Sequence, residues 1–282
     1  MRLELCGVRG STPAPGAEFV RYGGHTSCVA IGHDDEAPTL LLDAGTGIRR
    51  VDALLEGQPF RGSILLGHLH WDHTQGLPFF RSAEQDGSSV DVYMPAQGDP
   101  EAVLARLMSP PFFPVAPSGL SGSWTFRALE PGVHQIEGFV VEALEIPHKG
   151  GRTYGYRVGD GHSTVAYLSD HMPLALGAGP DGLGAYHDAA LRLARDCDVL
   201  IHDAQYTDAE LPVRGQYGHS AAGYAVGLGV AAGARRVLLF HHDPNRTDEA
   251  VDAIHRGLGA RGVQVDAASE GLVIDLPAVT SS

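Results

Sequence analysis

The sequence predicts an α/β fold, a four-layer αββα sandwich in which two mixed β-sheets face each other and helices lie outside. Segments with strand character crowd the first two thirds of the chain, whereas helices alternate with strands in the last third. The chain has 282 residues, 43% of them hydrophobic, which is enough to bury a sizeable core. Because no repeat, charge run or linker interrupts it, we expect residues 1–282 to form a single domain.

The first part of the chain is predicted to be mainly β. Apolar or alternating runs predict strands at residues 2–8, 27–32, 39–43 and 63–67, with a loop or helix at 47–57. After the segment VDVYMPA, Asp99 and Pro100 are typical of the N-cap and first residue of a helix that continues through EAVLARLM. Further strands are expected at 124–129, 134–146, 153–158 and 164–169.

In the last third, each expected helix precedes a strand. The pairs are helix 185–196 with strand 198–204, helix 221–233 with strand 235–242, and helix 248–258 with strands near 263–275. Ser220 is expected to be the N-cap of the second of these helices. This alternation is typical of a sheet whose outer face is covered by helices.

A dense polar cluster occupies the segment GHLHWDHTQG, residues 67–76. It places three imidazoles and one carboxylate close together, namely His68, His70, Asp72 and His73. Buried polar groups need partners, so this cluster is hard to explain as core and is typical of metal ligands. Imidazole and carboxylate suit Zn²⁺, with Mn²⁺ or Fe²⁺ as alternatives, and the lack of cysteine argues against a thiolate-bound structural zinc. A degenerate cluster that has lost its ion is the other interpretation.

The cluster fills every position of the HxHxDH signature, and so resembles the metallo-β-lactamase fold superfamily of hydrolases. Further polar residues end predicted strands behind it, namely His148 after Pro147, Asp170 in AYLSDHM, and His241 with His242 in LLFHHDP. The resemblance implies two metal ions, the first bound by His68, His70 and His148, the second by Asp72, His73 and His241, with Asp170 bridging both. His242 is the alternative to His241, because neighbouring strand residues point in opposite directions.

Such a site would prefer an anionic substrate, because two divalent ions outweigh two carboxylates and one bridging hydroxide. Two metals can polarise an electrophile, supply hydroxide at neutral pH and neutralise oxygens in an in-line displacement, and phosphodiesters gain most from this. His219 in GHSAA and Asp203 in LIHDAQ resemble the leaving-group pair of tRNase Z-like phosphodiesterases, many of which carry glutamate where this chain has aspartate. We expect Asp203 to orient His219 as a general acid, with helix capping as the alternative role of His219.

Several other motifs resemble a bacterial phosphodiesterase-like branch of this superfamily. They are GVRGSTPAPG, RYGGHTSCVAIG, LLDAGTG, HWDHTQGLPFF and LFHHDP, and they are spread over nearly the whole chain. The branch commonly reads YGGNTS where this chain has His25, which either alters a substrate contact or takes over a hydrogen bond of the turn. By resemblance, Asp43 in LLDAGTG is a structural carboxylate beside the site, and a turn aspartate is the alternative.

The substrate is expected to be small. A tRNase Z enzyme holds its substrate with a long arm between the metal histidine and the bridging aspartate, whereas residues 148–170 have room only for a strand pair. The net charge of −14 also disfavours a broad grip on nucleic acid, so we expect a cyclic nucleotide or a short nucleic-acid end. A lid insert is expected around 97–123, where Phe112 and Phe113 either stack on a base or anchor the loop. Candidate phosphate contacts are Lys149, Arg152 and Arg246.

Two alternatives stay open at this point: a hydrolase of lactones, β-lactams or other esters on the same scaffold, and a non-hydrolytic metabolite-binding protein.

Cys6, Cys28 and Cys197 are odd in number and share no motif spacing, which favours a reducing cytoplasm over a disulfide framework. No stretch reaches the ~20 apolar residues of a membrane span, so we expect neither an export signal nor a membrane partner. Homodimers are frequent in the resembling family, so a homodimer is a further expectation.

Overall fold

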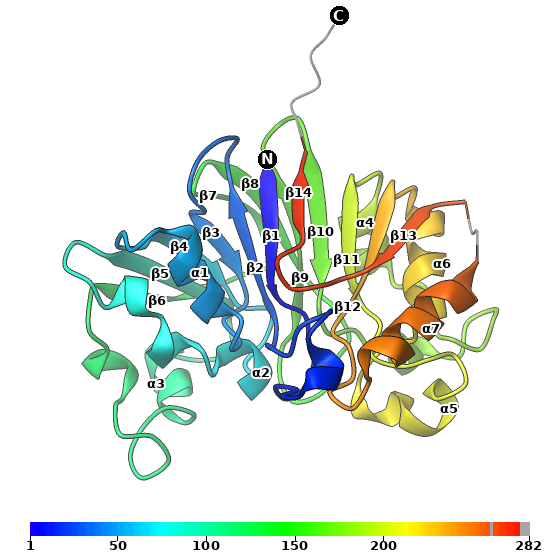
Figure 1. Ribbon diagram of the computed structural model, residues 1–282, viewed down its shortest axis with the longest axis horizontal. Helices are drawn as coiled ribbons and strands as arrows, with labels where there is room; N and C mark the ends of the chain where they lie inside the picture. Colours follow the sequence, from blue (N-terminus) through cyan, green and yellow to red (C-terminus); the bar gives the residue numbers. More distant parts are fainter. Residues whose placement is uncertain (260–261, 277–282) are drawn as a thin grey trace, which may run out of the picture.

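The computed structural model describes residues 1–259 and 262–276, and it contains two seven-stranded sheets (Figure 1). The first sheet comprises β1 (Arg2–Gly7), β2 (Cys28–Gly32), β3 (Leu40–Leu42), β4 (Arg61–Leu65), β5 (Ser89–Pro95), β6 (Trp124–Leu129) and β14 (Val273–Asp275). The second comprises β7 (Gly132–Ile136), β8 (Phe139–Glu145), β9 (Tyr154–Gly159), β10 (Thr164–Leu168), β11 (Val199–Asp203), β12 (Arg236–Phe240) and β13 (Gln264–Ala267). The strand orders are β14-β1-β2-β3-β4-β5-β6 and β13-β12-β11-β10-β9-β8-β7.

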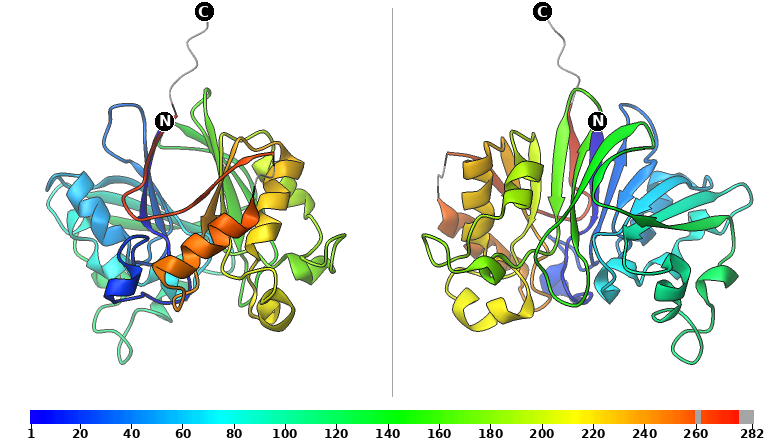
Figure 2. Two further views of the ribbon diagram at one scale, coloured as in Figure 1. Left: turned by 45° about the vertical axis from the view of Figure 1, so that its right-hand side comes forward. Right: turned by 180° about the vertical axis from the view of Figure 1, so that it is seen from behind.

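Helices cover the outer faces of both sheets, as the two views of Figure 2 show. They are α1 (Ile48–Leu54), α2 (Trp71–Thr74), α3 (Pro100–Ala105), α4 (Asp188–Ala194), α5 (Leu211–Arg214), α6 (Ala222–Ala232) and α7 (Asp248–Leu258). Helix α1 packs on the first sheet, and α4, α6 and α7 pack on the second. The predicted αββα sandwich of two mixed sheets is therefore confirmed.

The main core lies between the two sheets, where alternate side chains of both sheets point inward. Leu3, Phe139, Tyr156, Ile201 and Phe240 are fully buried in this layer. Burying one such side chain contributes roughly 1.5–3 kcal/mol. Two smaller apolar clusters lie under the helices on either outer face. The alternating apolar pattern of the strands thus fixes which face of each sheet turns inward.

The strand expected at 134–146 is wrong as a single element, because the chain folds there into an antiparallel hairpin of β7 and β8. The turn falls at Glu137 and Gly138, whose φ angles are 51° and 80°. Two successive positive φ angles are typical of the tight turns that match the twist of a hairpin. Glycine adopts this conformation without steric cost, so Gly138 is the residue that permits the turn.

The parallel strands position the site. Strands β3 to β6 run parallel in one sheet and β10 to β13 in the other, so the chain leaves many of them at the same edge of the sandwich.

The strands expected near 263–275 separate, because β13 ends the second sheet while β14 pairs with β1 in the first. Helix α3 begins as expected, with the Asp99 side chain accepting a hydrogen bond from the Ala102 amide.

The three cysteines Cys6, Cys28 and Cys197 are buried with free thiols. Within residues 1–259 and 262–276, every helix is too short or too polar to cross a bilayer.

Candidate metal centre

Side chains that follow several strands meet at one edge of the sandwich. His68 and His70 lie in the loop after β4, and Asp72 and His73 lie in α2, one short turn of helix. The loop after β8 supplies His148, Asp170 is the second residue after β10, and His241 directly follows β12. The structure therefore brings together all seven residues that the sequence nominates as metal ligands.

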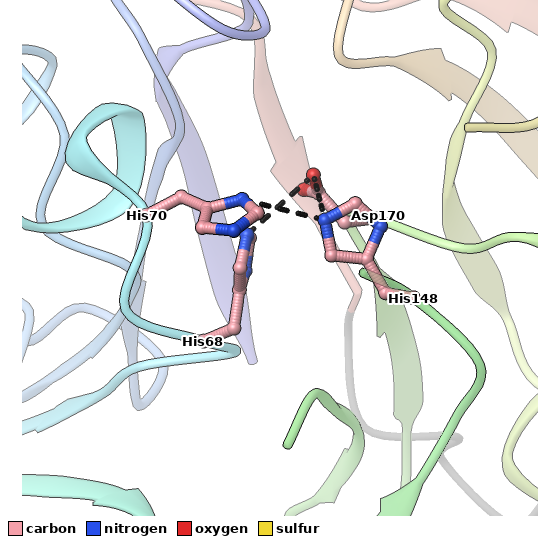
Figure 3. Close-up of side chains that lie close together, drawn as sticks. All are labelled: His68, His70, His148 and Asp170. Atoms are coloured by element: carbon pink, nitrogen blue, oxygen red, sulfur yellow. Dashed lines mark hydrogen bonds and ion pairs between the residues drawn. The ribbon is translucent and has the colours of Figure 1, made fainter. Parts of the chain in front are cut away.

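One cluster consists of His68, His70, His148 and Asp170, and Figure 3 shows their rings and carboxylate pointing toward one another. One potential ligand atom from each residue lies within 4.8 Å of the others. Asp170 Oδ2 is 3.7 Å from His68 Nε2 and 3.5 Å from His148 Nε2. His148 Nε2 is in turn 3.4 Å from His70 Nδ1.

A second cluster consists of Asp72, His73 and His241. The Nε2 atoms of His73 and His241 lie 3.3 and 3.1 Å from Asp72 Oδ2. The same two nitrogens lie 3.0 and 3.2 Å from Asp170 Oδ1. Asp170 thus turns one carboxylate oxygen to each cluster, which is the position of a bridging ligand.

Hydrogen bonds on the outer side of three imidazoles set their tautomers. The Nδ1–H groups donate to acceptors away from the centre: His73 to Asp43 Oδ2 at 2.6 Å, His148 to the Gly218 carbonyl at 2.7 Å, and His241 to Gln205 Oε1 at 2.9 Å. With Nδ1 protonated, each neutral ring presents its Nε2 lone pair to the centre. Metal-binding histidines are typically held in this way.

The lone pairs at the centre need a cation between them. Neutral imidazole nitrogens and carboxylate oxygens are both acceptors, so at 3.0–3.7 Å they repel one another unless positive charge separates them. Among the described residues, both ring nitrogens of His68, His73 Nε2 and Asp170 Oδ1 are buried without a hydrogen-bond partner. A donor set of imidazole and carboxylate without thiolate fits Zn²⁺, Mn²⁺ or Fe²⁺. The residues therefore fit a divalent-metal site.

The pKa shifts of the ligands agree with that fit. Burial raises the pKa of the Asp170 carboxyl, but the surrounding imidazoles, His241 first, outweigh it and hold the pKa well below its usual range. Burial lowers the pKa of His73, but Asp72 and Asp43 together with Asp170 raise it well above its usual range. A buried site that keeps its carboxylates ionised requires adjacent positive charge, and a divalent ion supplies it more fully than a proton.

His219 and Asp203 form a pair beside this centre. His219 Nδ1 donates to Asp203 Oδ2 at 3.0 Å and lies 3.6 Å from Asp170 Oδ2. The aspartate therefore reaches the imidazole without the extra methylene of a glutamate. Burial lowers the pKa of His219, but Asp203 and then Asp170 outweigh it and raise the pKa to about 9.

Ser220 is not the N-cap of α6, which corrects the sequence expectation. The N-cap is Ala221, and no side chain caps the helix there. The Ser220 hydroxyl donates instead to the His171 carbonyl, and its amide donates to Asp203 Oδ2. Ser220 thus helps to fix Asp203 through its amide, and a hydrogen bond from an N–H group to a carboxylate is stronger than one to a neutral acceptor.

The structure places His241, not His242, at the centre. His241 has a φ of 58°, and this left-handed conformation directly after β12 turns its ring toward Asp72 and Asp170. His242 Nε2 donates to the Ala268 carbonyl at 2.9 Å, away from the ligands. Asp43 lies beside the centre, where it also accepts hydrogen bonds from the Gly67 amide and the Tyr167 hydroxyl.

The mouth of the centre is a cavity of about 340 Å³ lined by Ser11, Leu69, His70, Trp71, Asp72, Leu107, Asp170 and His219. His25 does not line it, because its ring hydrogen-bonds Thr46 and its amide donates to Glu270. Arg152 and Arg246 are paired with Glu145 and Glu210, and Lys149 is exposed.

Sequence reasoning missed two supporting residues. The Ser11 amide donates to Asp72 Oδ2 at 2.6 Å, and Gln205 accepts from His241. The only sequence signal for them is that they lie in GVRGST and LIHDAQ, two segments already singled out for other reasons.

Comparison with known proteins identifies the family. A family model described as a beta-lactamase superfamily domain matches residues 39–242. Ribonuclease Z of Exiguobacterium sibiricum is 26% identical over 226 residues, which cover 66% of this chain and 73% of that protein. The metallo-beta-lactamase fold protein YhfI from Bacillus subtilis has a TM-score of 0.72 at 18% identity, covering 97% of this chain and 99% of its own. A diphosphatase from the PhnP family has a TM-score of 0.71 at 20% identity, covering 98% of both chains. The chain therefore belongs to the beta-lactamase superfamily, as a metal-dependent hydrolase of the metallo-β-lactamase fold.

Proposed function

We propose that this hydrolase is a phosphodiesterase that acts on a small phosphodiester, a cyclic nucleotide or a short nucleic-acid end, with two zinc ions. The observation that carries the proposal is the position of Asp170, which turns one oxygen to each ligand cluster and lies 3.6 Å from His219. A candidate proton donor and two ligand sets therefore converge on one point. The similarity to proteins named ribonuclease Z and diphosphatase supports chemistry at phosphorus.

In this proposal the two ligand clusters hold one ion each. His68, His70 and His148 would hold the first, Asp72, His73 and His241 the second, and Asp170 both. Bound divalent ions supply a Lewis acid for the phosphoryl oxygens and lower the pKa of water. The chain contributes the geometry, because Asp43, Gln205 and the Gly218 carbonyl fix the rings before any ion arrives.

His219 would protonate the leaving oxygen. Asp203 stabilises the His219 imidazolium and accepts the hydrogen bond from its Nδ1–H. The other ring nitrogen, Nε2, can therefore face the mouth that His219 lines. An alkoxide leaving from phosphorus is a poor leaving group and needs this proton, whereas hydrolysis of a strained lactone or β-lactam depends more on stabilising the oxyanion. The His219–Asp203 pair therefore favours a phosphodiester over the ester alternatives.

The expected small substrate rests on shape and charge. The interval 148–170 is filled by the antiparallel pair β9 and β10, which leaves no room for a long arm there. The mouth measures about 340 Å³, and the net charge of −14 disfavours an extended polyanion. The three buried free thiols support the accompanying proposal of a cytoplasmic location.

The test compares metal-loaded wild type with Asp170→Ala, His219→Ala and a control, His162→Ala, which changes an exposed histidine between β9 and β10. The substrates are bis(p-nitrophenyl) phosphate and 2′,3′- and 3′,5′-cyclic nucleotides, and bound metal is measured for every variant. We expect Asp170→Ala to abolish hydrolysis and to lower metal content. His219→Ala should slow cyclic nucleotide hydrolysis by roughly 10²–10⁴-fold and affect the activated ester much less.

The proposal is wrong if wild type holds two ions per chain and turns over none of these phosphodiesters. Lactones and β-lactams would then be tested next, because their hydrolysis depends more on an oxyanion stabiliser than on a dedicated proton donor. A control variant that loses activity together with His219→Ala would also count against the assigned role of His219.

A further inference from the structure

Trp71 stands between two metal-binding residues, yet 73% of its side chain is exposed. Together with Leu107 it lines the mouth of the centre and also a second groove of about 620 Å³. Because two residues form walls of both spaces, the groove adjoins the mouth. A substrate bound at the centre can therefore extend into it.

The walls of this groove are aromatic. Phe79 and Phe112 are 54% and 85% exposed, and both line it with Phe113 and Met108. Phe79 and Phe113 meet edge to face, with ring centroids 5.9 Å apart. Large apolar side chains gathered in the open beside a reaction centre mark a ligand-binding surface. We call Trp71, Phe79, Leu107, Phe112 and Phe113 the aromatic groove.

One cation accompanies the aromatic groove. Arg106 lines it and also lines an adjoining pocket with His70 and Gln97. Within the described part of the chain, the Arg106 side chain has neither an ion pair nor a hydrogen-bond partner. A guanidinium can contact phosphate through several N–H donors, and it also stacks on planar rings. The groove thus combines flat apolar walls with one available positive charge next to a metal centre.

We propose that the aromatic groove is a nucleobase subsite, which holds the base of a nucleotide whose phosphodiester lies at the metal centre. This inference rests on the proposed phosphodiesterase function and deepens it, because it assigns the residues that bind the base of the substrate. Bases stack on aromatic side chains whatever their hydrogen-bonding edge, so little preference among the four bases is expected. Arg106 then contributes attraction for the phosphate that adjoins the base.

The test uses two esters with the same leaving group, thymidine 5′-(p-nitrophenyl phosphate) and methyl p-nitrophenyl phosphate. Only the first carries a base. The variants are Phe112→Ala and Phe79→Ala, which change exposed side chains, and the matched control is Val133→Ala, an exposed apolar residue on β7 outside the groove. We expect wild type to have the lower KM for the thymidine ester. Each phenylalanine variant should raise that KM about tenfold with kcat nearly unchanged, and leave the methyl ester unaffected.

Equal KM values of wild type for the two esters would overturn the subsite, and so would an equal loss on both esters in Phe112→Ala. Size-exclusion chromatography is run on the same proteins. If Phe112→Ala dissociates a dimer without changing either KM, the groove is an interface between copies and the proposal is wrong.

A binding measurement separates failure of the subsite from failure of the phosphodiesterase function. Calorimetry compares thymidine 5′-monophosphate with methyl phosphate on metal-loaded wild type and Phe112→Ala. If neither ester is hydrolysed but the nucleotide binds at least tenfold more tightly and loses this advantage in Phe112→Ala, the subsite stands and the reaction is wrong. If the two phosphates bind equally, the subsite is refuted whatever the hydrolysis assays give.

Discussion

Replacing Gly10 with alanine tests whether the second ligand cluster depends on close packing behind His241. A Cβ added at Gly10 would lie 2.8 Å from Gln205 Oε1 and still closer to Nδ1 and Cε1 of the His241 ring. The methyl group would therefore occupy the space of the 2.9 Å hydrogen bond that orients this imidazole. Glycine is required here for space, because Gly10 does not have a positive φ.

The size of the effect follows from the distances. Unstrained contacts of carbon with nitrogen or oxygen begin near 3.4 Å, so the His241 ring and Gln205 must retreat by at least roughly 0.6 Å. Metal-ligand distances tolerate only about 0.2 Å. Losing the outer hydrogen bond of a metal-binding histidine typically costs 10–100-fold in metal affinity. We expect Gly10→Ala to weaken the second site by about 100-fold, near the upper end of that range.

The assay is competition for Zn²⁺ with a chromophoric chelator, together with metal content after dialysis and a thermal melt to confirm folding. If wild type holds the two ions per chain that we propose, Gly10→Ala should fall toward one, because the cluster of His68, His70 and His148 is untouched. The control is Gly257→Ala in α7, where an added Cβ meets nothing within 4 Å among the described residues. A folded Gly10→Ala protein that binds two ions with wild-type affinity would refute the reasoning.

Three further predictions test other parts of the molecule. Asp43→Asn removes the carboxylate that accepts from His73 Nδ1 at 2.6 Å, so metal affinity should fall roughly 10–100-fold in the chelator assay, with the fold intact by circular dichroism. Glu210 pairs with Arg246 at 2.7 Å. Burial disfavours the ionised Glu210 carboxylate, but Arg246 and Thr207 outweigh burial and lower the pKa of Glu210 from 4.5 to about 2. Its ionised form therefore stabilises the fold above pH 4.5, and this stability is lost as the pH falls toward 2. Glu210→Gln should cost about 1 kcal/mol in urea unfolding at pH 7, after allowance for solvent screening, and little near pH 2; an equal cost at both values would contradict this. Ile201→Ala, between the sheets, should lower the free energy of unfolding by about 2–5 kcal/mol, and a loss below 1 kcal/mol would argue against a close-packed core.

Two sequence expectations failed because a local pattern had more than one structural solution. The alternating apolar pattern from 134 to 146 runs through both arms of a hairpin, and only Glu137 and Gly138 mark the turn. A glutamate at positive φ is uncommon, so the turn lacked the usual asparagine–glycine signal. Ser220 has a residue type that favours N-caps, but α6 begins one residue later, with Ala221 as N-cap, and the Ser220 hydroxyl donates to the His171 carbonyl.

Those parts of the site whose geometry is local could be predicted from the amino-acid pattern. His68 and His70 alternate in an extended segment and so face the same way, and Asp72 and His73 follow in the first turn of α2. Parallel strands end at one edge of a sheet, so residues placed directly after predicted strands could be expected to converge there. The same reasoning applied to Asp170, whereas Asp203 was nominated by resemblance. The order of strand-like and helix-like segments, together with the family resemblance, predicted the sandwich.

The groups that support the metal centre, and the aromatic groove beside it, depend on how the sheets and loops pack and could not be predicted. The choice of His241 over His242 depends on a single positive φ after β12, which no residue pattern indicates. The amide of Ser11 and the carbonyl of Gly218 are backbone groups; every residue has the carbonyl and every residue except proline has the N–H, so their partners cannot be inferred from side-chain identity. The aromatic groove combines Trp71 of α2 with Phe112 and Phe113 of a loop far along the chain. These segments meet only because the packing of the folded chain brings them together.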